Sequence, residues 1–193
     1  SQATTGAAIN STYNYTTITN CNVIQGNQSS DSPAIFVQDA NYTTIANSTI
    51  TTWGNYSAAS GSGINLTKSS YANIYNTTIT TNGTNARAIS IYLGSYSNIT
   101  NVTSNANLSR GINLYLSNFN NLLNNNVTTT SSTAIFLDTS NNNNVTLNNV
   151  TGGYGIYLSS SNSNNVTGNN VTSAGFSNVG IFVTDENNLV VLG

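Results

Sequence analysis

The sequence predicts an all-β fold in which the chain winds as a single-stranded parallel β-helix (a solenoid) of about seven rungs, with three short strands per rung. Three observations predict it. A Gly-Ile or Ala-Ile step recurs along the chain, and another aliphatic residue stands ten residues after each of these isoleucines. A third aliphatic residue usually follows five residues later. The step itself returns every 21 to 29 residues, a period that is typical of repeat folds.

The first strand of each rung is predicted at the Gly-Ile or Ala-Ile step, with the isoleucine pointing inward and its polar neighbours pointing outward. These isoleucines are Ile35, Ile64, Ile89, Ile112, Ile135, Ile156 and Ile181. The second strand is centred on Ile45, Ile74, Ile99, Leu122, Val145, Val166 and Val191. The third is centred on Val23, Ile50, Ile79, Val127, Val150 and Val171, and Ser104 interrupts this series. The segment from the third strand to the next step absorbs all the variation in length, so we expect a variable corner there.

The two fixed corners carry residues that repeat from rung to rung. An aromatic column, seven residues after each isoleucine, contains Tyr42, Tyr71, Tyr96 and Phe119, whose rings are expected to stack. Two asparagine columns lie at the next corner: Asn20, Asn47, Asn76, Asn101 and Asn124 in one, and Asn125, Asn148 and Asn169 in the other. Asparagine tolerates the left-handed backbone of a tight turn, and stacked amides can form a hydrogen-bonded ladder.

The repeats divide the chain into two parts. Residues 1–15 are interpreted as an N-terminal segment that caps the solenoid or contacts another subunit, and residues 16–193 as the β-helix domain. No apolar run is long enough to span a membrane as a helix. No signal peptide opens the sequence, so Ser1 is interpreted as a mature N-terminus.

The stretch "GIYLSSSNSNNVTGNNVT" (155–172) resembles the repeats of right-handed parallel β-helix proteins of the pectate-lyase-like superfamily, most closely the Asn-rich NosD-type repeats. This resemblance covers roughly residues 16–191, and it implies a right-handed solenoid. It also raises the question of catalysis, because pectin-active members of the superfamily use clustered Asp residues, often with Ca²⁺, an Arg or a His.

The sequence offers little for such chemistry. It has three basic and five acidic residues and no histidine. Asp39 and Asp138 lie four repeats apart, too far for a carboxylate pair, and a strand would point Asp185 and Glu186 to opposite faces. Arg87 and Arg110 fall on consecutive rungs, with no acid placed to join them. We therefore predict no catalytic site, no metal and no cofactor. The same composition predicts no nucleic-acid partner, and Cys21 is interpreted as a small buried residue.

Asn-x-Ser/Thr triplets, the acceptors of N-linked glycans, occur throughout the chain. The column Asn126, Asn149 and Asn170 would crowd its glycans at a rung spacing of ~4.8 Å, so these residues are interpreted mainly as ladder residues. Triplets in the variable corner or near the N-terminus have more room. The candidate glycosylation sites are Asn10, Asn14, Asn27, Asn55, Asn82 and Asn107.

Phe136, Tyr157 and Phe182 each follow an inward isoleucine on consecutive rungs, which predicts an outward aromatic stripe. The stripe could contact another subunit, bind carbohydrate, or lie under the variable corner. Thr-x-Thr pairs on adjacent rungs are a feature of ice-binding surfaces, so ice binding is a further alternative. Asn replaces the first Thr from residue 126 onward, and this irregularity argues against it.

A surface with so few ionisable groups changes its charge little with pH, which favours an exposed structural protein. We therefore predict a secreted or cell-surface glycoprotein, archaeal-like in composition. We expect it to form a filament or sheath from copies of itself, joined end to end through their terminal rungs. The alternatives are a carbohydrate-binding module or adhesin and, ranked lower, a polysaccharide lyase or hydrolase relative or an ice-binding protein.

Overall fold

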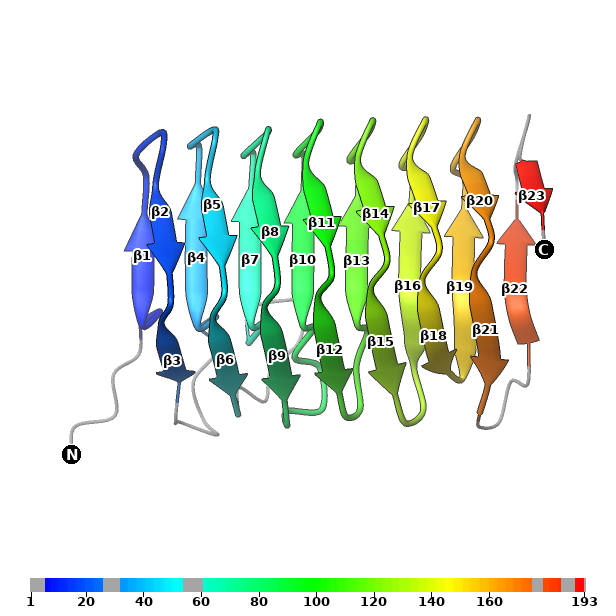
Figure 1. Cartoon of the computed structure of the whole chain (residues 1–193), viewed down its shortest axis with the longest axis horizontal. Coiled ribbons are helices and arrows are strands. Elements are labelled where there is room, and N and C mark those ends of the chain that lie inside the picture. Colours follow the sequence, from blue (N-terminus) through cyan, green and yellow to red (C-terminus); the bar gives the residue numbers. More distant parts are fainter. Residues whose placement is uncertain (1–5, 26–31, 54–60, 175–178, 185–189, 193) are drawn as a thin grey trace.

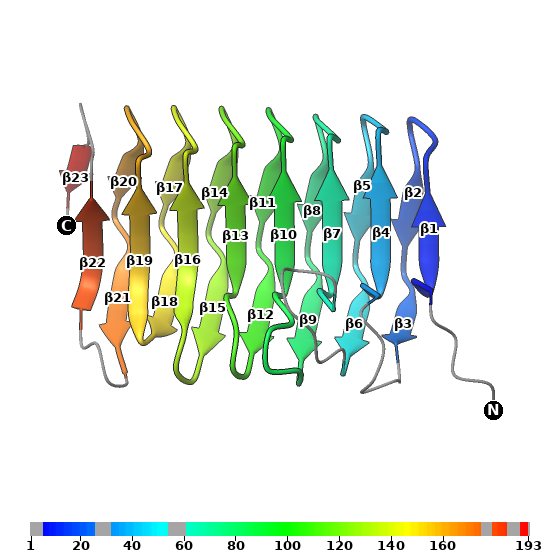
Figure 2. The same cartoon turned by 180° about the vertical axis from the view of Figure 1, so that it is seen from behind.

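The computed structural model describes residues 6–25, 32–53, 61–174, 179–184 and 190–192. Over these residues the chain winds into an elongated solenoid whose regular elements are all β-strands, with the two termini at opposite ends (Figures 1 and 2). The strands form three parallel sheets that run along the long axis.

Each complete rung contributes one strand to each sheet, and the three sheets are called A, B and C in chain order. Sheet A contains β1 (Ile9–Ser11), β4 (Ile35–Gln38), β7 (Ile64–Thr67), β10 (Ile89–Tyr92), β13 (Ile112–Tyr115), β16 (Thr133–Asp138), β19 (Tyr154–Ser159) and β22 (Val179–Thr184). Sheet B contains β2 (Thr17–Thr19), β5 (Thr44–Ala46), β8 (Asn73–Tyr75), β11 (Asn98–Thr100), β14 (Asn121–Leu123), β17 (Asn144–Thr146), β20 (Asn165–Thr167) and β23 (Val190–Leu192). Sheet C contains β3 (Asn22–Gln25), β6 (Thr49–Thr52), β9 (Thr78–Thr81), β12 (Thr103–Ala106), β15 (Asn126–Thr129), β18 (Asn149–Gly152) and β21 (Asn170–Ser173).

The sheets of eight, eight and seven strands make seven complete rungs, followed by β22 and β23 of an eighth. This confirms the all-β solenoid of about seven rungs with three short strands each. The predicted boundary at residue 16 falls too late. β1 lies within residues 1–15 and pairs with β4, Ile9 against Ile35, as the first strand of sheet A.

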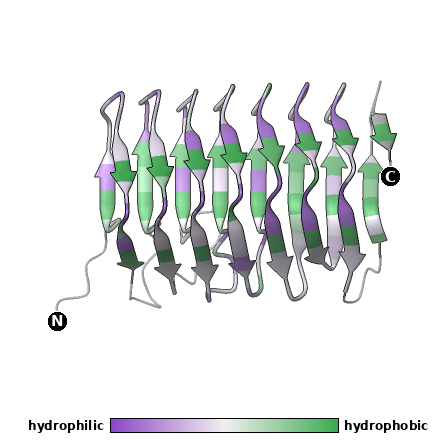
Figure 3. Cartoon of the chain, viewed as in Figure 1, coloured by the Kyte–Doolittle hydropathy of each residue, from purple (hydrophilic) through white to green (hydrophobic). Residues whose placement is uncertain are grey.

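The core is built from the predicted aliphatic columns. Ile64, Ile89 and Ile112 align one to one across β7, β10 and β13 and are fully buried. Apolar residues recur at matching levels of successive strands, as Figure 3 shows. Ser104 replaces the aliphatic residue of sheet C in its rung. It is also fully buried, and its hydroxyl has no hydrogen-bond partner. A continuous column of aliphatic side chains thus fills the solenoid, with one polar interruption.

Close packing explains why glycine precedes the isoleucine in the Gly-Ile step. A Cβ added to Gly111 would clash with the Val127 side chain of its own rung and lie 2.7 Å from the carbonyl oxygen of Ala134 on the next rung. The step therefore lets sheet A approach the aliphatic column of sheet C closely.

The fixed corners use left-handed backbone conformations at non-glycine residues. Asn47, Asn76 and Asn101 have φ of 49°, 48° and 53°, as predicted for this asparagine column. The aromatic column does the same, with φ of 62° at Tyr42 and 57° at Phe119. A left-handed conformation costs an ordinary residue roughly 1–2 kcal/mol. The rings offset this cost by stacking at centroid distances of 4.9 to 5.2 Å along the series Tyr15, Tyr42, Tyr71, Tyr96 and Phe119.

Asparagine amides form ladders on the outside of the solenoid, in which the hydrogen bonds run from Nδ2 of one residue to Oδ1 of the residue one rung earlier. One ladder runs along sheet B through Asn73, Asn98, Asn121, Asn144 and Asn165. A second follows the corner through Asn47, Asn76, Asn101 and Asn124. A third runs along sheet C through Asn126, Asn149 and Asn170.

Buried asparagines form ladders of the opposite direction. Asn125 donates from Nδ2 to Oδ1 of Asn148 on the next rung at 2.9 Å, and Asn148 donates to Asn169 at 3.0 Å. The reason is that Oδ1 of Asn125 faces the previous rung, where it accepts the backbone N–H of Val102 at 2.9 Å. Each buried carboxamide therefore takes the place of a backbone hydrogen-bond partner at the corner. It pairs with backbone groups that would otherwise be buried without a partner.

Candidate functional site

The outer face of sheet A gathers aromatic and cationic side chains outside the core. From β7 onward, the first outward position of each strand carries Asn65, Ser90, Asn113, Phe136, Tyr157 and Phe182 on successive rungs, and Phe36 precedes them on β4. From β7 onward, the second outward position carries Thr67, Tyr92, Tyr115, Asp138, Ser159 and Thr184. Arg87 and Arg110 come from the variable corner just before β10 and β13.

The predicted stripe of Phe136, Tyr157 and Phe182 is a run of rings in edge-to-face contact, with centroids 4.8 and 4.9 Å apart. Tyr154 joins it, 5.4 Å from the Phe182 ring. Phe136 occupies an outward position but is only 5% exposed. The Arg110 guanidinium lies over its ring, 3.8 Å from the centroid. The accessible part of the stripe is therefore Tyr157 and Phe182, both half-buried.

Tyr92 and Tyr115 extend the aromatic surface toward the N-terminal rungs. Their rings stack at 5.4 Å with 12° between the planes, and both are partly exposed. The stripe and this tyrosine pair together form a surface of aromatic side chains along the outer face of sheet A.

The two arginines fold back over their own rungs. Arg87 donates from Nη1 to the Ser90 hydroxyl at 3.4 Å, and Arg110 donates to Oδ1 of Asn113 at 2.8 Å. Burial, and to a smaller extent the neighbouring charge of Arg110, lower the pKa of Arg87 to about 10, although Asp138 opposes both effects. Burial also lowers the pKa of Arg110, again opposed by Asp138.

The arginine pair corrects one sequence-based inference. Asp138 does lie near enough to act electrostatically on both arginines, because it occupies the second outward column one rung beyond Arg110. Among the described residues, however, no carboxylate oxygen comes within ion-pair distance of either guanidinium. Asn113 is 1% exposed, and its Nδ2 has no hydrogen-bond partner.

The part of the chain that the structure describes holds no group of three or more His, Cys, Asp or Glu side chains that could bind a metal ion. Asp39 accepts a hydrogen bond from Nε2 of Gln38 at 3.0 Å and lies four rungs from Asp138. Cys21 is half-buried, with its thiol 3.2 Å from the carbonyl oxygen of Thr19. Asp185 and Glu186 lie outside the described residues.

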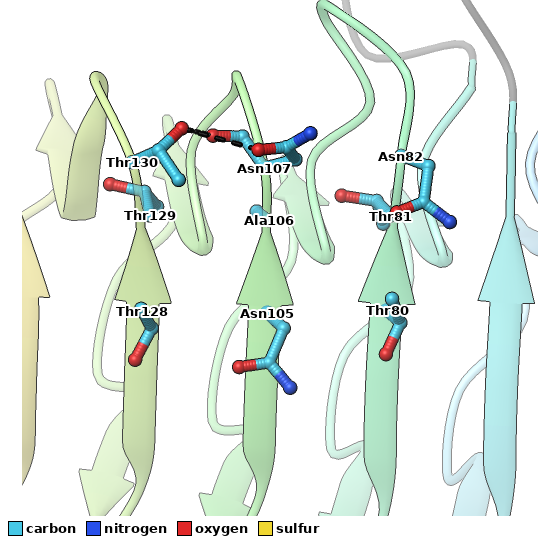
Figure 4. A pocket seen from close by; sticks show the side chains of 9 residues that line it. All are labelled: Thr80, Thr81, Asn82, Asn105, Ala106, Asn107, Thr128, Thr129 and Thr130. Atoms are coloured by element: carbon cyan, nitrogen blue, oxygen red, sulfur yellow. Dashed lines mark hydrogen bonds between the residues drawn. The ribbon is translucent and has the colours of Figure 1, made fainter.

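A hollow of ≈ 160 Å³ lies beside the variable corner on sheet C (Figure 4). It is lined by Thr80, Thr81, Asn82, Asn105, Ala106, Asn107, Thr128, Thr129 and Thr130. Asn82 and Asn107, two candidate glycosylation sites, sit on neighbouring rungs, because the Asn107 N–H donates to the Thr81 carbonyl at 3.0 Å. The Thr130 hydroxyl donates to the backbone carbonyl oxygen of Asn107 and lies 3.3 Å from Oδ1 of the same residue.

This adjacency changes the argument about glycosylation. The sequence predicts more room for Asn82 and Asn107 than for the column Asn126, Asn149 and Asn170, but in the structure Asn82 and Asn107 are one rung apart, as are successive members of that column. Asn10 and Asn14 are exposed, and Asn14 accepts the backbone N–H of Asn41 at 2.7 Å. Asn27 and Asn55 lie outside the described residues.

A second hollow, of ≈ 260 Å³, lies on the outer face of sheet B. It is lined by Asn73, Ile74, Tyr75, Asn76, Asn98, Thr100 and Asn101, a set in which no residue is charged.

Residues 5–191 match the family model described as right-handed β-helix region. The chain belongs to the right-handed β-helix family. No curated protein matches it. The match confirms the right-handed winding that the resemblance implied and extends over nearly the whole chain.

Membership of the right-handed β-helix family does not assign an activity. The family includes enzymes, such as pectate lyases, and proteins without catalytic function. The described residues contain no helix long and apolar enough to cross a membrane.

Sequence reasoning missed two features of this β-helix. The contact between Arg110 and Phe136 joins two rungs through the path of the variable corner, which periodicity does not specify. The sequence indicates the sheet B hollow only weakly. Tyr75 is the one aromatic residue in the described part of its column, which consists of Thr19, Ala46, Tyr75, Thr100, Leu123, Thr146 and Thr167.

Proposed function

We propose that this chain is a structural, non-catalytic element that assembles end to end with copies of itself. The observation that carries the proposal is the exposure of core residues at the C-terminal end of the solenoid. Val191 is 44% exposed, whereas Val166, in register with it one rung earlier, is 1% exposed. Ile181 is half-buried, although Ile156 before it is fully buried.

A further rung stacked on this face, contributed by another copy of the chain, would bury Val191 and Ile181. The outer edges of β22 and β23 also carry backbone groups that can pair with another strand. At the other end, β1 presents Ile9, which is half-buried. A contact between the two ends continues the aliphatic column from one copy into the next. Because this contact is heterologous and does not close on itself, it propagates as a filament.

The surface supports a role outside the cell. With few charged side chains and no histidine, the chain has little to protonate or deprotonate around neutral pH, so its stability depends weakly on pH there. Asn10, Asn14, Asn82 and Asn107 are exposed acceptor triplets, which fits a glycoprotein of the cell surface or a sheath.

Electron microscopy and sedimentation of the purified protein test the proposal. The wild type is expected to form filaments whose length grows with concentration. Val191→Lys places a charge on the exposed end and is expected to abolish them. Leu147→Lys is the matched control, because Leu147 is an exposed aliphatic residue (57%) at a corner in the middle of the solenoid. Filaments that persist in Val191→Lys, in protein with unchanged circular dichroism, would refute end-to-end assembly.

The aromatic surface of sheet A supports a second candidate, a carbohydrate-binding module or adhesin. Tyr92 and Tyr115 offer partly exposed rings beside two arginines that lack an ion-pair partner among the described residues. Acidic oligosaccharides would then bind to the wild type and bind less tightly to Tyr115→Ala. Equal binding by both proteins would remove this candidate.

A further inference from the structure

The hollow on sheet B arises from a single large side chain among small ones. Tyr75 stands in register with Ala46 on one side and Thr100 on the other. Its ring is 37% exposed and forms a wall, and the smaller Thr100 leaves the space beside it open. The strand alternation that builds the solenoid fixes both side chains on the outer face.

Two amide ladders border this space. Asn73 and Asn98 belong to the sheet B ladder, joined at 3.1 Å, and Asn76 and Asn101 belong to the corner ladder, joined at 3.4 Å. A carboxamide has two N–H donors and an oxygen that accepts two bonds, so a ladder bond leaves capacity for a ligand. Asn73 begins its ladder, because its counterpart one rung earlier is Thr44, and its Nδ2 has no hydrogen-bond partner among the described residues.

We propose that this hollow binds one pyranose unit of a neutral polysaccharide. The apolar C–H face of the sugar rests on the Tyr75 ring, and its hydroxyl groups bond to the flanking amides and to Thr100. An aromatic wall with a few converging polar groups is the usual composition of a small-molecule site. A volume of ≈ 260 Å³ lies below the ~300 Å³ at which sites for drug-sized ligands begin, which suits a single sugar ring.

The chemistry of the lining selects a neutral ligand. No charged side chain lines the hollow, so a carboxylate, sulfate or phosphate would lose its hydration without gaining an opposite charge. Amides, by contrast, both donate and accept, as do sugar hydroxyls. The site uses neither the ends of the solenoid nor the outer face of sheet A, so it stands apart from both candidate functions.

Two variants of the full chain test the site in opposite ways. Tyr75→Ala removes the wall, and Thr100→Tyr fills the hollow while keeping every amide in place. Tyr13→Ala is the matched control, because Tyr13 is an exposed tyrosine (78%) between β1 and β2 that lines neither the hollow nor the aromatic surface of sheet A. Titration calorimetry with cellohexaose, xylohexaose and mannohexaose measures neutral binding, and an oligogalacturonate serves as the charged probe. Circular dichroism establishes that each variant is folded.

We expect at least one neutral hexasaccharide to bind with a Kd of millimolar order or tighter. Tyr75→Ala and Thr100→Tyr should each weaken that binding at least about tenfold, and Tyr13→Ala should leave it unchanged. Three results would overturn the proposal: no neutral hexasaccharide binds, Thr100→Tyr binds as well as the wild type, or Tyr13→Ala loses binding as strongly as Tyr75→Ala. A preference for the oligogalacturonate would also overturn it, and would favour sheet A instead.

Discussion

Asn149 donates a hydrogen bond from Nδ2 to Oδ1 of Asn126, one rung earlier, at 3.1 Å. The hydrogen bonds of the other outer ladders run in the same direction, so the first residue of each ladder only accepts within it. This direction distinguishes two chemically identical substitutions. At position 126 an aspartate still accepts from Asn149, whereas at position 149 it loses the donor and sets a carboxylate oxygen against Oδ1 of Asn126.

Asn149→Asp is therefore expected to destabilise the protein by about 1 kcal/mol, and Asn126→Asp by much less. For a chain of this length that difference corresponds to roughly 2–4 °C in Tm. Differential scanning calorimetry at neutral pH measures both. The two variants remove one acceptor triplet each, so the comparison is matched. Equal melting temperatures would show that the ladder direction has no energetic consequence.

The aliphatic column makes a stronger prediction. Ile135 is fully buried and lies between Ile112 and Ile156. Ile135→Asp buries a charge with no partner and should unfold the domain cooperatively, at a cost of more than about 4 kcal/mol. Leu147→Asp, at an exposed corner, should keep its circular dichroism spectrum and nearly the wild-type Tm. A folded Ile135→Asp variant would contradict the register of sheet A.

Periodicity in the sequence was enough to predict the strands, the core columns and the two fixed corners, because stacking makes each residue meet its counterpart one rung along. Tyr42 and Tyr71 stack as expected, and Asn76 bonds to Asn47. The aromatic column begins one rung earlier than predicted, at Tyr15, because this tyrosine stands six residues after Ile9 of the first rung, whereas the later rings stand seven residues after their isoleucines.

The candidate sites were harder to predict because they depend on interruptions of the pattern. Arg110 reaches Phe136 from the variable corner, whose path no repeat specifies, and Asn82 and Asn107 are neighbours only through the pairing of β9 with β12. Tyr75 creates its hollow by being larger than its neighbours in the column. Such features follow from differences between rungs, whereas a repeat analysis extracts what the rungs share.

The adjacency of Asn82 and Asn107 leads to a prediction about glycan occupancy. At a rung spacing of ~4.8 Å two glycans would compete for the same space above the hollow. Asn107 is also held by the Thr130 hydroxyl, so we expect Asn82 to be the occupied site. Intact glycopeptide mass spectrometry on native protein should find molecules with one glycan across the pair and incomplete occupancy along Asn126, Asn149 and Asn170. Molecules that carry glycans on both Asn82 and Asn107 would contradict the crowding argument.

The two arginines of sheet A are expected to respond oppositely to the same substitution. Arg87 is largely desolvated, is repelled by Arg110 and makes one long hydrogen bond to Ser90, so Arg87→Met should raise the stability at neutral pH by about 1 kcal/mol. The lowered pKa of Arg87 predicts the same direction for this change in stability. Folding lowers that pKa to about 10, so the charged form opposes folding at neutral pH, and this cost fades only as the pH rises through about 10.

Arg110→Met removes the guanidinium from the Phe136 ring and leaves the buried Asn113 without its one hydrogen-bond partner. An unsatisfied buried amide costs about 1–3 kcal/mol, so this variant should melt several degrees below the wild type. Calorimetry at pH 7 on the wild type and both variants measures the contrast. We expect the Tm of Arg87→Met to lie above that of the wild type, and the Tm of Arg110→Met to lie below it. Equal destabilisation of both variants would contradict this prediction. It would mean that the surroundings of Arg87 stabilise it enough to offset its burial and its repulsion by Arg110.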